Sequence, residues 1–194
     1  MPFDVERQKE HFKKHVSVFT DYGNIKILDF KEPGTSNYRI RFLFEEDYYR
    51  LHISGDLGEL IATNYSNMCY EKFSDFVHNT EYFMDKIDCH SRKLYEYDYD
   101  MCKKELEELF ENFDFTPQYS FETEEEVRKE KLDEILDDLD LDHGLGSKAY
   151  EVLNELDEYC YEYIGELGKV DTGILEVYML AFELAQEQLK EDKK

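Results

Sequence analysis

The chain has 194 residues, of which 47 are Asp or Glu and 23 are Lys or Arg, giving a formal net charge of −24. Such a charge repels phosphate backbones and anionic membrane surfaces, so it disfavours direct nucleic-acid binding and membrane association. Hydrophobic residues make up 41%, with 16 Tyr and 14 Phe, which is too apolar and aromatic for a disordered acidic tail. We therefore expect a folded chain that buries roughly 70% of its unfolded surface.

The sequence also indicates a cellular compartment. The residues after Met1 are mixed and charged, and no apolar run reaches about 18 residues, so we expect neither a secretory signal nor a membrane span. The four cysteines lack CxxC spacing, which favours reduced thiols in a cytoplasmic protein over a disulfide framework. We predict no cofactor, no metal site and no catalytic residues.

The first half of the chain has the pattern of an antiparallel meander. A short polar helix over residues 5–13 precedes two alternating segments, and Asp21-Tyr22-Gly23-Asn24 supplies a turn between them. The loop at residues 31–37, rich in turn residues, leads to three further short segments. We predict five strands, over residues 15–20, 25–30, 38–44, 48–53 and 59–64.

The hydrophobic period becomes helical after Tyr70. Thr123 and Glu126 have the spacing of a capping box, which places a helix start at this point. The last helix is apolar nearly all round, so we expect it to be packed centrally or covered by a partner. The predicted helices cover residues 69–77, 82–87, 102–113, 124–139, 147–167 and 173–190.

Charge divides the chain into two regions. Residues 1–97 hold 17 acids and 13 bases, whereas residues 98–194 hold 30 acids and 10 bases. We therefore predict an α+β fold, with an antiparallel sheet region over residues 1–97. An acidic helical bundle over residues 98–194 is expected to pack on that sheet.

Acids alternate in one loop, where Asp138, Asp140 and Asp142 resemble the start of a calcium-binding loop. The pattern then departs from the template, because His143 stands where glycine is required and Ala149 where a bidentate Glu is required. We interpret the segment as a polar interhelical loop with incidental weak cation affinity.

The turn from Ser54 to Gly58 supports a competing hypothesis. Its small residues suit a phosphate cradle, but the turn joins two strands and lacks both GxGxxG and GK[ST], which favours a tight hairpin turn. With His15 or His52 as a base, it would be the centre of an enzyme acting on nucleic acid or nucleotides. No sequence of the nucleophile-elbow type accompanies it.

Acidic helix faces interleaved with tyrosines are the strongest candidate for a functional surface. Carboxylates repeated once per helical turn lie about 5 to 6 Å apart, close to the spacing of alternate phosphates along a DNA strand, about 6 to 7 Å. Tyrosine offers a rigid surface to a partner's arginine. The predicted partner-binding residues are Glu105, Glu108, Asp138, Asp140, Asp142, Glu151, Glu155, Asp157, Glu158, Tyr159, Glu162 and Tyr163, together with the neighbouring Asp137.

Residues 8–100 resemble a family of small proteins encoded by phages and mobile elements of Gram-positive bacteria. The resemblance rests on the strings HFKKH (11–15), ILDF (27–30), PGTSNY (33–38), ISGDLGE (53–59) and YFMDKI (82–87). It implies no particular catalytic residue. Its phage setting, together with the acidic tail, is similar in character to anti-CRISPR and other host-defence inhibitors.

Taken together, these features predict a phage-encoded, non-enzymatic inhibitor in the host bacterial cytoplasm. Its acidic surface would occupy the nucleic-acid-binding groove of a basic host protein such as a CRISPR nuclease. The alternatives are the enzyme described above and a phage structural or regulatory protein that forms a homo-oligomer, such as a homodimer, through its last helix.

Overall fold

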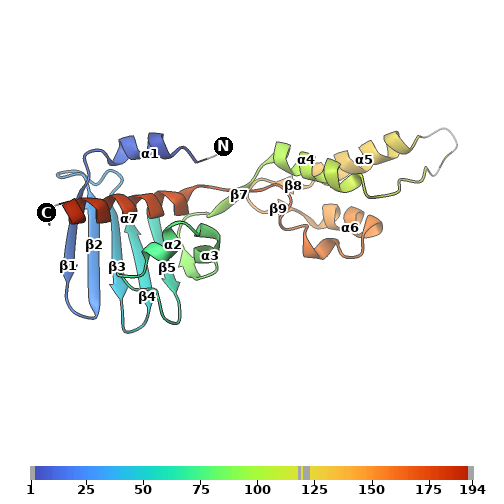
Figure 1. Cartoon of the computed structure of the whole chain (residues 1–194). Coiled ribbons are helices and arrows are strands. Elements are labelled where there is room, and N and C mark those ends of the chain that lie inside the picture. The colour runs from blue at the N-terminus through green and yellow to red at the C-terminus, as the bar shows by residue number, and fades with distance from the viewer. Residues whose placement is uncertain (1–2, 118, 120–122, 192–194) are drawn as a thin grey trace. The chain divides into compact units, whose positions relative to one another are not determined.

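The computed structural model describes residues 3–117, 119 and 123–191 and confirms the predicted α+β class (Figure 1). The chain forms two compact units. Met1–Leu94 and Gly173–Lys194 make up the first, which we call the sheet unit, and Tyr95–Thr172 makes up the second, which we call the inserted unit. The predicted boundary at residue 97 therefore holds only approximately, and residues 173–194 belong with the sheet.

The sheet unit is built on a six-stranded antiparallel meander in which sequence neighbours are also spatial neighbours. The five predicted strands are confirmed within a few residues. A sixth was missed, because its four residues carry no alternating apolar pattern and three of them are exposed. The strands are β1 (Val16–Asp21), β2 (Ile25–Lys31), β3 (Ile40–Glu45), β4 (Arg50–Gly55), β5 (Gly58–Thr63) and β6 (Ile87–His90).

Helix α7 (Ile174–Glu191) lies across one face of this sheet (Figure 1). Its Phe182 is fully buried, with ring centroids 5.3 Å from Phe42, 6.2 Å from Phe44 and 4.8 Å from Phe73. The apolar helix is thus packed centrally in its own unit. Self-association through this helix, the predicted route to a homodimer, stays a prediction, and it would have to use the face of α7 that does not pack on the sheet.

Three shorter helices complete the sheet unit: α1 (Val5–Phe12), α2 (Ser74–Val77) and α3 (Thr80–Met84). The predicted helix over residues 69–77 is shorter in the structure and consists of α2 alone, because residues 70–73 form turns. Phe73, in the last of these turns, and Phe76, in α2, are both buried in the core. Both α1 and α3 begin at a side-chain cap, from Asp4 and Asn79 respectively, which satisfies backbone N–H groups at the helix start.

A side chain of α7 makes hydrogen bonds to backbone groups at the open edge of strand β1. Gln188 Oε1 accepts hydrogen bonds from the backbone N–H of Ser17 (3.0 Å) and from its hydroxyl (3.1 Å). Its Nε2 donates to the carbonyl of His15 (2.9 Å). The amide thus stands in for the peptide group of a neighbouring strand and satisfies edge groups that would otherwise be open to another chain.

The inserted unit has its own core. Its helices are α4 (Tyr99–Phe110), α5 (Glu124–Leu136) and α6 (Ser147–Leu156), followed by a 3-10 turn, η1 (Cys160–Glu162). Two short antiparallel pairs accompany them: β7 (Tyr95–Tyr97) with β10 (Lys169–Asp171), and β8 (Leu139–Asp140) with β9 (Gly144–Leu145). The buried residues include Cys102, Leu106, Phe110, Ile135, Leu136, Ala149, Leu153 and Cys160.

We expect Phe182→Ala to lower the free energy of unfolding of the sheet unit by about 3–5 kcal/mol, since it removes a ring that contacts three buried phenylalanines. Tyr22→Ala is the matched control because 69% of this side chain is exposed, and it should change the value by less than about 0.5 kcal/mol. Urea unfolding measures both. Equal effects would contradict the assigned core.

Stability should also depend on the protonation of His15, which is 3% exposed and whose Nε2 lies 3.1 Å from the carbonyl oxygen of Tyr38. Burial lowers the pKa of this imidazole, so the folded state prefers its neutral form. The contribution of neutral His15 to the free energy of unfolding is therefore fully present above about pH 6.5, the pKa of histidine in the unfolded chain. It is lost as the pH falls through the lower pKa of the folded state.

Protonation of His15 should lower the free energy of unfolding by at most about 1.4 kcal/mol for each pH unit. His15→Gln, which retains a donor for Tyr38, should show a shallower decline of unfolding free energy between pH 7 and pH 5. Parallel curves for the two proteins, measured by urea unfolding at each pH, would show that His15 is not the titrating group.

Candidate functional site

The negative charge is concentrated in the inserted unit. Residues 95–172 hold 26 Asp and Glu against seven Lys and Arg, whereas the remainder of the chain holds 21 acids and 16 bases. The sheet unit is thus close to charge balance. A surface that selects a basic partner by charge must lie mainly on the inserted unit.

On α4, the two predicted contact residues have different roles. Glu105 is half-buried and accepts a hydrogen bond from the backbone N–H of Gly168 (2.7 Å). Gly168 has a φ of +76°, and a side chain at this position would collide with Cys102. Glu105 therefore fastens the chain before β10 onto α4, whereas Glu108 is exposed and pairs with Lys104 one turn away (3.6 Å).

The loop of alternating acids is a small hairpin, β8–β9. Asp138 Oδ2 accepts the backbone N–H groups of Lys148 (2.9 Å) and Ala149 (3.0 Å), so it caps the start of α6. That helix has no side-chain cap of its own, because Gly146 is its N-cap residue. Asp138 is thus a structural residue that caps the start of α6.

The next acids in this loop stabilise the turn itself. Asp140 Oδ1 accepts hydrogen bonds from the backbone N–H of Asp142 (2.8 Å) and from His143 Nδ1 (3.0 Å). These bonds, first that from Asp142 and then that from His143, lower the pKa of Asp140. The carboxylate remains exposed and ionised at the tip of the hairpin.

The predicted helix over residues 147–167 is too long. Helix α6 ends at Leu156, and Asp157 is extended, with φ −147° and ψ 112°. Glu151 and Glu155 therefore share one exposed helix face, on which Glu155 pairs with Lys131 of α5 (3.3 Å). The other two glutamates of the expected row, Glu158 and Glu162, lie beyond the end of the helix.

Asp157 accounts for this break. Its Oδ1 accepts the backbone N–H of Tyr159 (2.9 Å) and its Oδ2 accepts the hydroxyl of Tyr163 (3.0 Å), which fixes a turn where the helix would otherwise continue. Burial, followed by the hydrogen bond to Asp157, raises the pKa of Tyr163. Asp157 and Tyr163 are thus internal to the fold, while Tyr159 remains 56% exposed.

Helix α5 carries an acidic stripe, of which only the last member, Asp137 at the helix C-cap, was among the predicted contact residues. Glu126, Glu130, Asp133 and Asp137 recur at intervals of four, three and four residues and are all exposed. Glu126 completes the predicted capping box, because its Oε2 accepts the backbone N–H of Thr123 (2.8 Å). The other three carboxylates face solvent over about 10 Å of helix length.

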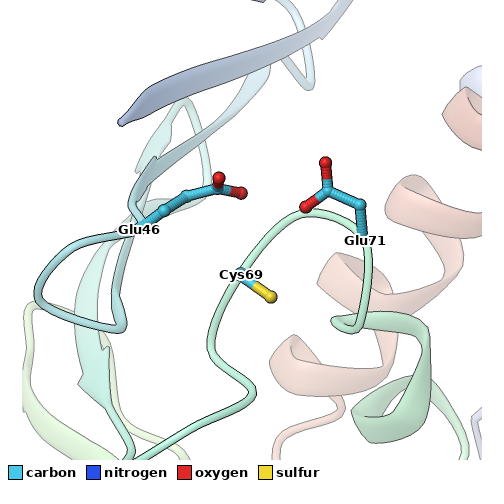
Figure 2. A group of neighbouring side chains, drawn as sticks. All are labelled: Glu46, Cys69 and Glu71. Atoms are coloured by element: carbon cyan, nitrogen blue, oxygen red, sulfur yellow. The ribbon is translucent and has the colours of Figure 1, made fainter. Parts of the chain in front are cut away.

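A second cluster, in the sheet unit, has the residue types of a metal site. Glu46, Cys69 and Glu71 place one ligand atom each within 4.8 Å of one another, and Figure 2 shows the two carboxylates facing each other near the sulfur. However, the buried ammonium of Lys26 pairs with both carboxylates, at 3.0 Å from Glu46. This ammonium supplies the positive charge that a metal ion would otherwise bring.

The pKa of Lys26 supports this assignment. Burial favours the neutral amine, but hydrogen bonds to Glu71 and Glu46 outweigh that effect and raise the pKa above its ordinary value. The same bond lowers the pKa of Glu71. The cluster is therefore an ion-pair group around one buried lysine, and it joins β2, the turn after β3 and the segment before α2.

The groups of the competing enzyme hypothesis also have structural partners. Gly55 and Gly58 have positive φ, and a Cβ at Gly55 would lie 1.9 Å from the carbonyl oxygen of Arg39. Asp56 accepts the backbone N–H of Tyr38 (3.1 Å), and His52 pairs with Glu45 (3.0 Å). These contacts explain the glycines and the turn as a tight β4–β5 hairpin.

Cys69, Cys89, Cys102 and Cys160 are free thiols. Burial raises the pKa of Cys102 to about 11, which disfavours its reactive thiolate form. Across the described ranges, the helices are too short or too polar to cross a bilayer. No protein-family model, curated protein or solved structure matches this chain.

We expect Asp138→Ala to destabilise α6 by about 1 kcal/mol, since two N–H groups at the helix start lose their acceptor. Hydrogen exchange of the α6 amides measures the loss as reduced protection. Asp137→Ala is the matched control, because this neighbouring carboxylate is exposed. Equal protection in the two variants would contradict the capping role.

Proposed function

We propose that this protein is a non-enzymatic inhibitor whose inserted unit binds the nucleic-acid-binding surface of a basic host protein. The observation that carries the proposal is the charge of the inserted unit, 26 acids against seven bases in a compact body of 78 residues. A surface of this sign attracts proteins that bind phosphate backbones and repels nucleic acid itself.

The spacing of the carboxylates supports the proposal. Successive carboxylates of the α5 stripe are separated by about 4.5 to 6 Å along the helix axis, slightly less or slightly more than one turn. Alternate phosphates of a DNA strand are separated by about 6 to 7 Å along the duplex axis. A groove that aligns Lys and Arg side chains with phosphates can therefore align them with Glu130, Asp133 and Asp137.

The residues that we propose as partner contacts differ from those predicted from the sequence. Some predicted acids are excluded, and further acids of α5 are added. Glu105, Asp138 and Asp157 hold backbone or side-chain groups of the inserted unit, so their loss would act through folding. The exposed carboxylates that remain for a partner are Glu108, Glu130, Asp133, Asp137, Glu151, Glu155, Glu158 and Glu162. Asp140 is also exposed, but its carboxylate holds its own turn as well.

The resemblance of residues 8–100 to phage and mobile-element proteins makes a defence nuclease, and among these a CRISPR nuclease, our proposed target. The protein would act in the cytoplasm of the infected bacterium. Binding would be direct competition for a groove, with no chemical step and no cofactor.

The test is a pull-down with the tagged full chain from the lysate of a CRISPR-bearing bacterium, followed by mass spectrometry. We expect a CRISPR nuclease to be retained at low salt, weakened at high salt and displaced by its own guide RNA or DNA. Recovery of no nucleic-acid-binding protein would contradict the proposal.

Charge reversal locates the surface. Changing Glu130, Asp133 and Asp137 together to Lys should weaken nuclease binding by at least about tenfold and reduce its salt dependence. The matched control changes three exposed acids of the sheet unit, Glu10, Glu81 and Asp85, to Lys, which gives the same net charge. Equal loss in both variants would indicate that overall charge, and not this surface, governs binding.

A further inference from the structure

Two tyrosine rings project from the turn after α6. Tyr159 is 56% exposed and Tyr161 is 59% exposed, and their ring centroids lie 6.4 Å apart with an interplanar angle of 48°. We call residues 157–163 the tyrosine turn. Large aromatic side chains are exposed in such pairs at protein-binding surfaces, where rigid rings provide contact area at low entropic cost.

Buried and hydrogen-bonded residues of the inserted unit fix the backbone of the tyrosine turn. Cys160, between the two tyrosines, is fully buried in the core of the inserted unit. Asp157 binds the backbone N–H of Tyr159 and the hydroxyl of Tyr163, and the backbone N–H of Ile164 donates to the carbonyl of Cys160 (2.9 Å). Both exposed rings therefore stand on a backbone that is already ordered before a partner arrives.

The surroundings of the rings are negative. Glu158 and Glu162 are exposed on the same turn, and the hydroxyl of Tyr161 donates to Glu162 Oε1 (3.3 Å). The faces of tyrosine rings attract cations, and these carboxylates add to that attraction. The inserted unit already contains one such contact, in which Lys169 Nζ lies 4.3 Å from the ring centroid of Tyr95.

We propose that the tyrosine turn is an arginine-binding site, which takes guanidinium groups of a basic protein onto the rings of Tyr159 and Tyr161. Glu158 and Glu162 pair with the same groups. Arginine fits better than lysine, because its planar guanidinium stacks on an aromatic face while still donating to a carboxylate. The inference rests on the proposed function and identifies the side chain that the acidic unit recognises.

The test compares two peptides of equal charge, acetylated (Arg-Gly)4 amide and acetylated (Lys-Gly)4 amide, by calorimetric titration of the full chain at physiological salt. If both rings are used, their contacts make the arginine peptide bind roughly fivefold to thirtyfold more tightly. The double variant Tyr159→Leu with Tyr161→Leu should lose this preference, whereas Tyr159→Phe with Tyr161→Phe should keep it. Circular dichroism confirms that each variant is folded.

Tyr22→Leu with Tyr48→Leu is the matched control, since these two rings are 69% and 66% exposed on the sheet unit, and the preference should persist there. Equal binding of the two peptides by the unchanged protein would overturn the inference while leaving a charge-based inhibitor intact. An arginine preference that survives the leucine variant would also overturn it, because the carboxylates alone would then be responsible. Binding of neither peptide would count against both the inference and the proposed function.

Discussion

The sheet unit depends on one contact that is completed near the end of the chain, the packing of α7 on the inner face of the meander. Strands β1 to β5 are joined by short connections, so they can pair locally. Phe73 covers part of their apolar face, but the part that packs on Phe182 remains open until the 78 residues of the inserted unit have been passed. Non-local contacts of this kind slow folding, because the loop must be closed before the burial of apolar surface rewards it.

Sequence patterns predicted the helices and strands that are long enough to show a repeating hydrophobic pattern. Alternation revealed five strands, and the spacing of Thr123 and Glu126 located the start of α5. The remaining strands, β6 to β10, are two to four residues long and therefore carry no measurable alternation. The expected continuation of α6 failed for another reason: apolar residues keep a helical spacing through Tyr163, while the side chain of Asp157 fixes a turn instead.

The candidate surface was predictable as a region and not as a set of residues. Charge counts placed the acids in the second half of the chain, and the structure concentrates them further within residues 95–172. Whether a given carboxylate is free depends on which backbone N–H groups lie beside it. Glu105 meets Gly168, which is 63 residues away, and Asp138 meets the start of another helix, so neither partner can be inferred from local sequence.

The pairing of β7 with β10 brings the two ends of the inserted unit together, since Tyr95 lies opposite Asp171 and Tyr97 opposite Lys169. An insertion whose ends are adjacent makes little demand on the host fold, which could close the same gap with a short connection. The inserted unit could in this sense be replaced without changing the fold of the sheet unit. If the inserted unit binds the partner as we propose, exchange of this unit for another would change the partner without changes to the sheet.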